Sequence, residues 1–403
     1  ISDDNFYRVD TSSADDEFEN TGLVLDYNGV SMYNSVINKG MVKYHKDLDS
    51  IGISAVHRIY SFDNRTALEA LANVRYYMIR KEFTQNLPYG FSKYKDYSTE
   101  TNEYTIYKND YPLSIGYTYD KYIDNEEYEK LSAIEKQQVM LEAAVLDTKN
   151  VKSLAKEDTR SVSDKIKYGT VTVKSKDGVV VKTDRIRSKK EESTLTLSYE
   201  KKKGYEAYLM LDGVITKKPR IKAKISTDNM EKNIVLRNND LTYALGRDSY
   251  LINLGYSDTS ESEDVTFTIP IEAKINYSDV KVCYVPMDDY VSQIEERNEE
   301  SLQNVLTDKN NEVSGNVTLS SDKVMVFSIP YSSGWKAYVD GKETSVFRAN
   351  TMYMGINMTK GSHKVVLRYN SPGLHLGMMA SAAGIIIWIL LAVASKKKKQ
   401  KGR

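Results

Sequence analysis

The stretch that decides the fold runs from Tyr331 to Gly373 and reads YSSGWKAYVDGKETSVFRANTMYMGINMTKGSHKVVLRYNSPG. Apolar and polar residues alternate along three short runs, which is typical of strands that bury one face. Asp340-Gly341 suits the two φ > 0 positions of a type I′ hairpin turn, and Gly361 marks a turn before the last run. We therefore expect this stretch to be the closing sheet of a β-sandwich. The alternating positions are Trp335, Ala337, Val339; Met352, Met354, Ile356, Met358; and Val365, Leu367, Tyr369.

An uncharged apolar segment, Leu374–Ser395, follows Pro372-Gly373 directly. It contains no Lys, Arg, Asp or Glu, and it has about the 20 residues that a helix needs to span the hydrocarbon core. The tail at 396–403 holds six basic residues and no acid, which is typical of the cytoplasmic end of a span. The sequence therefore predicts a cell-membrane protein with a transmembrane helix at 374–395, a basic cytoplasmic tail at 396–403 and an extracytoplasmic region at 1–372.

The charge balance argues against nucleic acid as a partner. The chain has 56 basic and 56 acidic residues, and six of the basic ones lie in the tail, so the remainder has 50 basic residues against 56 acidic ones. A mildly acidic region is not suited to neutralising phosphates. The single cysteine, Cys283, excludes a disulfide within the chain, which fits a Gram-positive surface protein better than a secreted eukaryotic module. We interpret Cys283 as a small buried apolar residue.

The chain begins with ISDDNFYRVD, without a Met and without a signal peptide. The extracytoplasmic region must nevertheless cross the membrane. We expect either that an export signal was removed or that the chain is the C-terminal part of a longer membrane protein whose earlier helices carried it across.

Residues 1–150 predict an extracytoplasmic α/β domain, because short runs rich in β-branched and aromatic residues alternate with helical patterns. Thr66 with Glu69, and Ser132 with Glu135, have the spacing of capping boxes and predict two helix starts. The second predicted helix continues through KQQVMLEAAVL. Its apolar residues Ile134, Leu141 and Val145 recur at helical spacing.

The rest of the extracytoplasmic region reads as β-rich. Residues 151–184 predict a linker and a first strand, and residues 185–372 predict a β-sandwich-like region with one helix near 288–306. The charge run in that helix is typical of a solvated face. The predicted fold class is therefore a mixed α/β N-terminal domain, then a mainly antiparallel β-sandwich region, and one C-terminal transmembrane helix.

Several runs of sequence resemble the YfhO family of bacterial membrane proteins. The most specific is VFSIPYSSGWKAYVDGKETSVFRANTMYMGINMTKGSHKVVLRYNSPGLHLG, which follows the family pattern IPYxxGWxAYVDGKxxxxxxANxxFMGxxLxxGxHxIxLxYxxPG. The likeness covers nearly the whole chain. The other matching runs are FYRVD, LDYNGVSMYNS, PLSIGYTYDKYIDNEEYEKLSAIEKQQVMLEAAVL, YLINLGYS and VPMDDY.

This resemblance implies a polytopic protein similar to membrane glycosyltransferases that use polyprenyl-phosphate sugars. Members are linked to adding sugars to lipoteichoic acid or other polymers of the Gram-positive cell envelope. Their catalytic carboxylates lie in loops between early membrane helices, which this chain does not contain. The resemblance therefore implies membrane lipid, an envelope-polymer acceptor and an upstream transmembrane region as partners, and it places the sugar donor and the chemistry outside this chain.

The residues themselves assign no catalytic, cofactor-binding or metal site. The four histidines have no metal-ligand spacing, and the chain has neither a nucleophile elbow nor a phosphate-binding loop. The one marked bias is 31 Tyr against 8 Phe. Tyrosine suits polymer binding, although the commoner use of any single Tyr is as a strand former.

Trp335, flanked by Tyr331 and Tyr338, is the candidate polymer-binding position. A sugar-stacking platform is one interpretation. A core anchor is the favoured one, because Ala337 and Val339 share the face of Trp335.

Two classes of function stay open. In the first, the chain is the extracytoplasmic part of a membrane glycosyltransferase and orients an acceptor polymer. In the second, it is a membrane-anchored carbohydrate-binding or scaffold protein without catalysis. A run of spanning segments upstream would favour the first, and a single signal peptide would favour the second.

Overall fold

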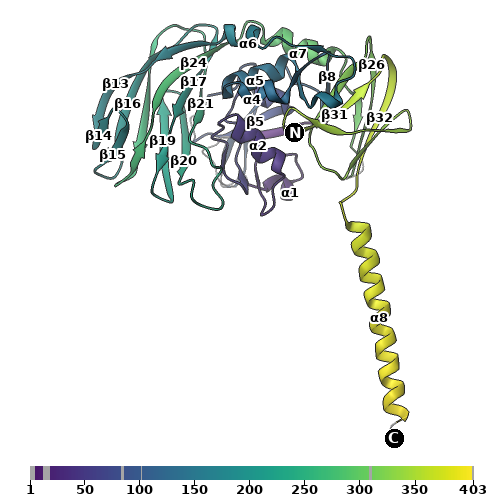
Figure 1. Cartoon of the computed structure of the whole chain (residues 1–403). Helices are drawn as coiled ribbons and strands as arrows, with labels where there is room; N and C mark the ends of the chain where they lie inside the picture. Colours follow the sequence, from purple (N-terminus) through teal and green to yellow (C-terminus); the bar gives the residue numbers. More distant parts are fainter. Residues whose placement is uncertain (1–4, 12–18, 83–85, 101, 308–310, 402–403) are drawn as a thin grey trace.

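The computed structural model describes residues 5–11, 19–82, 86–100, 102–307 and 311–401. Antiparallel β-sheet is the main secondary structure of the described chain, and one long apolar helix leaves the C-terminal end (Figure 1). The predicted fold class is thereby confirmed. The helices are α1 (Thr21–Leu25), α2 (Lys39–Asp47), α3 (Thr66–Leu71), α4 (Asn125–Lys130), α5 (Ala133–Glu142), α6 (Arg160–Lys165), α7 (Tyr290–Glu299) and α8 (Leu374–Lys401).

The N-terminal part combines small sheets with helices α1 to α5. Its largest sheet has the order β1-β5-β7-β6, with strands Arg8–Thr11, Val74–Arg80, Glu103–Asn109 and Phe91–Ser98. Parallel pairs occur in it and in the sheet β10-β9-β11 (Ala144–Leu146, Lys121–Asp124, Ala155–Lys156). A third sheet, β2-β4-β3, joins Met32–Tyr33, Arg58–Ile59 and Ile53–Ala55.

Only one of the two predicted capping boxes is present. Ser132 and Glu135 form the reciprocal bonds of a capping box at the start of α5, as predicted. At the other site a helix does start at Thr66, as predicted, but the capping box is absent, because the Thr66 hydroxyl donates to Glu206 Oε1 at 2.8 Å. The Thr66 side chain bonds Glu206 from a distant strand and makes no capping bond to its own helix. The predicted helix over KQQVMLEAAVL is also too long, because Val145 belongs to strand β10.

Two antiparallel sheets share the central core. One has the order β12-β24-β17-β21, with strands Lys167–Thr170, Asp279–Pro286, Tyr205–Asp212 and Tyr250–Ser257. The other has the order β13-β16-β22-β19-β20, with strands Thr172–Asp177, Ser193–Glu200, Ser262–Ile269, Arg220–Thr227 and Met230–Arg237. In β16, Ser193, Leu195, Leu197 and Tyr199 are buried and the residues between them are less so, which is the alternation expected of a half-buried strand.

The segment 151–184 contains β11, α6, β12, β13 and β14. Strand β14 belongs to a small edge sheet, β14-β15-β23-β18, made of Val179–Lys182, Arg185–Ser188, Lys274–Asn276 and Ile215–Thr216. The division of the chain near 150 and 184 remains our proposal. Cys283 in β24 is buried, as predicted, and burial raises the pKa of its thiol to about 12.

The C-terminal stretch supplies both sheets of a module, not the single closing sheet that we predicted. One sheet, β25-β26-β32-β28-β29, contains Gln303–Leu306, Glu312–Leu319, Gly361–Tyr369, Trp335–Val339 and Lys342–Thr344. The other, β30-β31-β27-β8, contains Phe347–Ala349, Tyr353–Met358, Lys323–Pro330 and Gly116–Tyr119. The hairpin at Asp340-Gly341 is confirmed, with φ of 51° and 80°. Gly361, however, lies where the chain crosses from one sheet to the other.

Strand β31 explains why the sequence pattern indicated one sheet where the structure has two. Its predicted core residues Met354, Ile356 and Met358 are buried between the two C-terminal sheets, but Tyr353 on the opposite face is buried against the N-terminal core. Met352, predicted on the same stripe, precedes β31 and packs with the N-terminal core, so this part of the prediction is wrong. A strand that is buried on both faces cannot be recognised from one alternating stripe. Its sheet is completed by β8, which is distant in sequence.

The predicted helix near 288–306 is present as α7, which ends at Glu299; Gln303–Leu306 forms strand β25. The apolar helix is α8, whose segment Leu374–Ser395 has a mean hydropathy of 2.3 and no buried residue. It is the candidate membrane span among the described residues. Residues 402–403 of the predicted tail lie outside the described residues.

Candidate functional site

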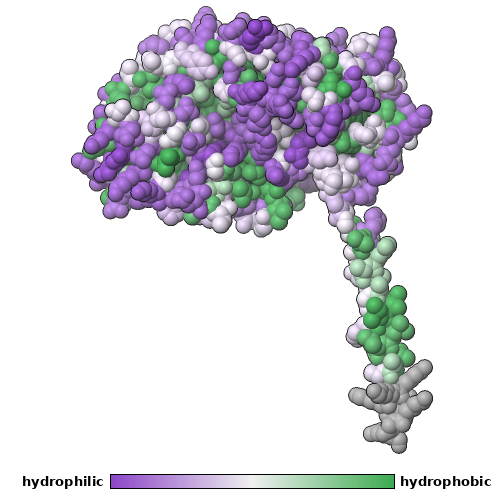
Figure 2. Space-filling model, viewed as in Figure 1, coloured by the Kyte–Doolittle hydropathy of each residue, from purple (hydrophilic) through white to green (hydrophobic). Residues whose placement is uncertain are grey.

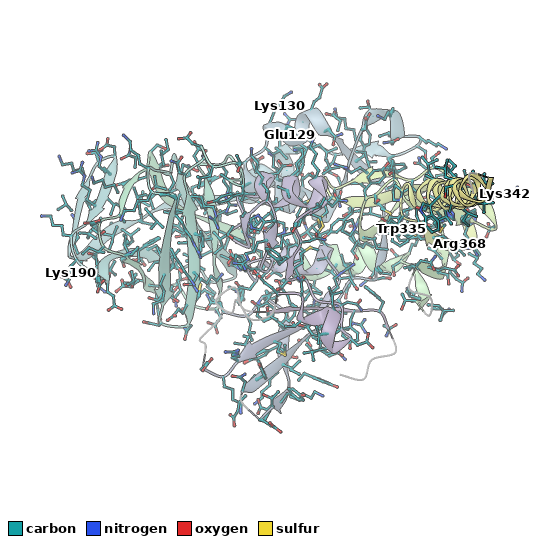
Figure 3. All side chains as sticks on the ribbon, turned by 90° about the horizontal axis from the view of Figure 1, so that it is seen from below. Glu129, Lys130, Lys190, Trp335, Lys342 and Arg368 are labelled. Carbon is teal, nitrogen blue, oxygen red and sulfur yellow. The ribbon has the colours of Figure 1, made fainter. Side chains whose placement is uncertain are left out.

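Trp335 lies at the margin of the C-terminal core, next to the start of α8. Its ring is half-buried and contacts Tyr369, with the ring centroids 5.1 Å apart. The preceding Gly334 accepts a backbone hydrogen bond from Asn370 at 2.9 Å, and a side chain at position 334 would collide with that segment. Figure 3 views this end of the molecule along α8, with Trp335 and Arg368 labelled beside the helix.

Tyr331 and Tyr338 do not share one surface with each other. Tyr331 packs against the same core as Trp335, and the Arg348 guanidinium lies 5.3 Å from its ring centroid. Tyr338 is an odd number of positions from Trp335 on β28, so its side chain points to the other face of the sheet. There the guanidinium of Arg368 lies 5.4 Å from its ring centroid. The three aromatic residues therefore form no single platform, and their binding role stays a prediction.

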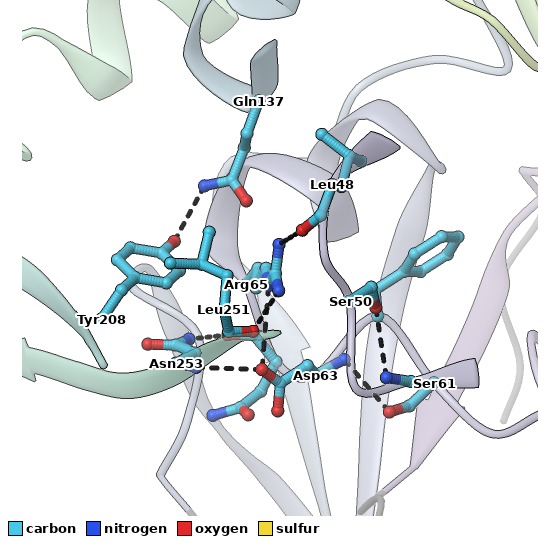
Figure 4. A network of polar contacts seen from close by, with 12 residues as sticks. Leu48, Ser50, Ser61, Asp63, Arg65, Gln137, Tyr208, Leu251 and Asn253 are labelled. Carbon is cyan, nitrogen blue, oxygen red and sulfur yellow. Dashed lines mark hydrogen bonds and ion pairs between the residues drawn. The ribbon is translucent and has the colours of Figure 1, made fainter. Parts of the chain in front are cut away.

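A buried cluster of charged side chains joins the N-terminal part to the central sheets (Figure 4). The ammonium of Lys232 lies 2.7 Å from Asp63 Oδ1, and both side chains are fully buried. Asp63 Oδ2 accepts from the backbone N–H of Asn253 at 2.9 Å. Arg65 donates to the backbone carbonyl of Leu48 at 2.8 Å and also to that of Leu251.

The cluster continues to Glu206, which accepts from Tyr208 at 2.5 Å; Gln137 donates to Tyr208 at 2.8 Å. Burial raises the pKa of Glu206. The charges have partners from different elements of the chain and no solvent exposure, so a substrate could not reach them. We interpret the cluster as architectural.

Two more carboxyls, Asp10 and Glu69, lie buried next to this cluster. Burial raises the pKa of Asp10 to about 7 and the pKa of Glu69 well above its ordinary value, so the pair retains protons near neutrality. Asp10 accepts from the backbone N–H groups of Thr11 and Phe62 at 2.7 and 2.9 Å. His45 stacks on Phe62 nearby, and burial lowers its pKa to about 3. These groups are as inaccessible as the charged cluster.

A groove on the N-terminal sheet has the composition of a ligand site. It has a volume of about 410 Å³. Its walls combine tyrosine rings with aliphatic side chains, one carboxylate and one ammonium group. We call it the tyrosine groove and define it by Tyr27, Tyr97, Tyr104, Asp26 and Lys95.

The geometry of the tyrosine groove suits a flat ligand with hydroxyl groups. The rings of Tyr97 and Tyr104, which come from adjacent strands β6 and β7, have centroids 6.4 Å apart and an interplanar angle of 32°. Tyr97 is 51% exposed, whereas Tyr104 is buried. Aromatic faces bind apolar surfaces, and Asp26 and Lys95 offer an acceptor and a donor at the wall.

Sequence reasoning missed this groove, although the tyrosine excess contained a signal. Many tyrosines are interior strand residues whose hydroxyls donate to internal acceptors; Tyr117 and Tyr119, for example, donate to the carbonyls of Leu71 and Met140. The groove tyrosines come from separate segments of the chain and do not differ in local pattern from these. Among the described residues, no group of three His, Cys, Asp or Glu side chains could hold a metal ion.

The chain matches the family described as "Bacterial membrane protein YfhO" over residues 1–381. It is 25% identical over 422 aligned positions to a Bacillus subtilis (strain 168) protein described as "Uncharacterized protein YfhO". That alignment covers 99% of this chain and 44% of the relative, so the chain spans less than half of the relative's length.

Solved structures resemble only parts of the chain. The GH115 4-O-methyl-α-glucuronidase BtGH115A aligns with a TM-score of 0.23, at 12% identity, over 30% of this chain and 18% of the enzyme. The mycobacterial arabinofuranosyltransferase AftD aligns with a TM-score of 0.18, at 15% identity, over 45% of this chain and 14% of AftD. Scores this low carry no argument about function.

Proposed function

Because the chain belongs to the YfhO family of bacterial membrane proteins, we propose that it is the extracytoplasmic part of a polytopic glycosyltransferase. In this proposal the whole protein transfers sugars from a polyprenyl-phosphate donor to a cell-envelope polymer such as lipoteichoic acid. The catalytic portion lies upstream of residue 1. The part described here holds and orients the acceptor.

The tyrosine groove is the observation on which the proposed acceptor-binding role of residues 1–372 rests. An acceptor polymer offers rings and chains with both apolar faces and hydroxyl groups, and the groove offers tyrosine rings beside Asp26 and Lys95. Leu25 at the end of α1 also lines the groove. Figure 1 places α1 at the lower edge of the β-rich region, on the side from which α8 leaves. A polymer anchored in the membrane would therefore reach the groove without crossing the whole molecule.

The proposed topology places residues 1–372 outside the cell and the basic end of α8 inside. Protease added to intact protoplasts should digest the β-rich region and spare the tail. Protection of an epitope inserted near Asn150, in a preparation whose known surface proteins are digested, would contradict this orientation.

A matched pair of tyrosine variants tests acceptor binding. Tyr97 in the groove and Tyr168 on β12 are both 51% exposed, so neither substitution removes a core residue. Tyr97→Ala should weaken binding of purified lipoteichoic acid to the detergent-solubilised chain about fivefold, the equivalent of one stacking contact of about 1 kcal/mol. Tyr168→Ala should bind as the wild type does. Equal affinities for all three proteins would remove the groove from the proposal.

The alternative, a membrane-anchored polymer-binding or scaffold protein, predicts the same binding but no sugar transfer. The full-length protein should transfer sugar from a polyprenyl-phosphate donor, and residues 1–372 alone should not. Binding without transfer by the full-length protein, across the donors tested, would favour the scaffold. Sugar transfer by residues 1–372 alone would contradict the proposal, because the catalytic residues would then lie in this region and not upstream of it.

A further inference from the structure

Helix α1 and the loop between β2 and α2 expose an unusual number of aliphatic side chains. Leu23, Val24 and Leu25 are consecutive and are 86%, 83% and 67% exposed, and Val36 is 83% exposed. We call these four residues the underside patch. Single exposed apolar residues are ordinary, whereas a group of this kind marks a contact surface.

The underside patch is held in a defined shape. The backbone of α1 is closed at both ends by left-handed residues, Asn20 and Asp26. Asn20 exchanges two hydrogen bonds with the backbone of Tyr33, at 2.7 and 3.0 Å, and so ties the loop that carries Val36 to the start of α1. Tyr27 bonds Thr21 at 2.5 Å across the turn. The apolar side chains are thus presented outward by a braced turn.

The patch lies on the side of the molecule from which the candidate membrane span leaves. Figure 2 shows hydrophobic side chains gathered along the lower edge of the β-rich region, where Figure 1 places α1, and α8 descends from the same side. Trp335 and Tyr369, at the ends of β28 and β32 that lie next to the link into α8, add an aromatic pair of the kind enriched at membrane interfaces. A membrane that contains α8 would face both positions.

We propose that the underside patch inserts into the lipid–water interface of the membrane that α8 crosses, and so lays the β-rich region down on the bilayer. The side chains project as a convex turn, which a fluid lipid surface can surround, whereas a protein partner would need a complementary hollow. The patch is aliphatic and carries no charge, so its affinity comes from apolar burial and does not require anionic lipid.

This second contact fixes an orientation that α8 alone does not. The last strand and α8 are joined by a short link in which Gly373 has a φ of 80° and the N–H of Leu374 donates to the carbonyl of Ser371 at 3.1 Å, so α8 alone holds the β-rich region through this one link. Two points of attachment, α8 and the underside patch, would hold the tyrosine groove close to the membrane, because Leu25 belongs to both the patch and the groove wall. The proposal concerns lipid contact only and stands whether or not the whole protein transfers sugar.

Fluorescence quenching in bilayers tests the proposal on the complete 403-residue chain. Val24→Cys and Val173→Cys each place one thiol on an exposed valine, the first in the patch and the second on β13, and each is labelled with the fluorophore NBD. The natural Cys283 is buried and does not label. Each protein is reconstituted into phosphatidylcholine–phosphatidylglycerol vesicles with and without headgroup-proximal spin-labelled lipid.

Spin-labelled lipid should lower the emission of the label at position 24 at least twofold and leave that at position 173 unchanged, while aqueous iodide should do the reverse. Emission from position 24 that responds to iodide and not to spin-labelled lipid overturns the proposal, because the patch is then in water. Emission shielded from both quenchers also overturns it, because the patch is then covered by protein. The same result in vesicles without anionic lipid would confirm that the contact is apolar.

Discussion

The buried cluster around Asp63 and the underside patch place residues in opposite ways. Inside the molecule, Asp63, Arg65 and Lys232 are charged and fully buried. At the lower edge, Leu23 and Val24 are apolar and almost fully exposed. Each arrangement is costly by itself, since charges lose hydration on burial and apolar side chains order water on exposure.

The difference between the two regions is where the compensating partners lie. Lys232 finds Asp63 and the backbone carbonyl of Asn253 within 2.8 Å, all in the same chain. The apolar side chains of α1 have no buried residue beside them in their own helix. Charges that are satisfied internally indicate architecture, whereas apolar groups without an internal partner indicate an external one.

Lys232→Ala should produce the largest loss of stability, because it leaves the carboxylate of Asp63 buried with much less compensation. Removing one partner of a buried ion pair costs about 3–5 kcal/mol. Urea unfolding of the full chain in detergent measures the change. Lys336→Ala is the matched control: its ion pair with Glu343 is exposed, and its loss should cost at most about 1 kcal/mol. If both variants lose a similar free energy of unfolding, the buried pair of Lys232 and Asp63 contributes no more to stability than an exposed ion pair.

Trp335→Ala should have an intermediate effect, because the ring is half-buried. A fully buried Trp costs about 3–5 kcal/mol on truncation, so we expect about 2 kcal/mol and a melting temperature lower by several degrees. Tyr338→Ala, on the opposite face of β28, should be milder. An unchanged melting temperature for Trp335→Ala would identify the ring as an exposed platform and move the candidate polymer-binding surface to this hairpin.

The buried acids Asp10 and Glu69 predict a pH dependence of stability. Their folded pKa values are raised, so above about pH 4 the folded state holds more protons than the unfolded state and stability falls as the pH rises. His45 acts in the opposite sense, with a pKa lowered to about 3, but its contribution is complete above its ordinary pKa of about 6.5.

The measurement is therefore made at pH 6.5–8, where His45 no longer contributes. The pKa of His363 is raised by its hydrogen bond to Asp340, so its stabilising effect also falls with rising pH in this window, equally in the wild type and in the variant below. The free energy of unfolding of the wild type should fall there by up to about 1.4 kcal/mol per pH unit for each buried acid that stays protonated. Glu69→Gln retains the shape without a titratable proton and should flatten the slope. An identical slope in both proteins would show that Glu69 does not hold a proton in the folded state.

Val24→Ser should have the smallest effect on stability, within about 0.5 kcal/mol, because an exposed side chain loses few internal contacts. A thermal melt in detergent beside wild type measures it. Leu195→Ser on β16, where the side chain is buried, is the contrasting substitution and should be strongly destabilising. A large loss for Val24→Ser would mean that the patch packs on the molecule itself.

The sequence alone determined several features because their causes are local. An uncharged run long enough to cross a bilayer specifies α8, the Ser132–Glu135 spacing specifies the start of α5, and Asp340-Gly341 specifies the hairpin. Each depends on residues within a few positions of one another. The family pattern in the C-terminal stretch likewise needed no knowledge of the fold.

Only the tertiary structure decided the features that depend on distant partners. Thr66 lost its predicted cap role to Glu206, and β31 gained a second buried face because the N-terminal core packs on it. The tyrosine groove needs strands β6 and β7 beside α1, and the underside patch is an exposed patch only because nothing else in the described chain covers it. Local patterns report what a side chain prefers, but burial and neighbours are set by long-range contacts, and these decide which preference is met.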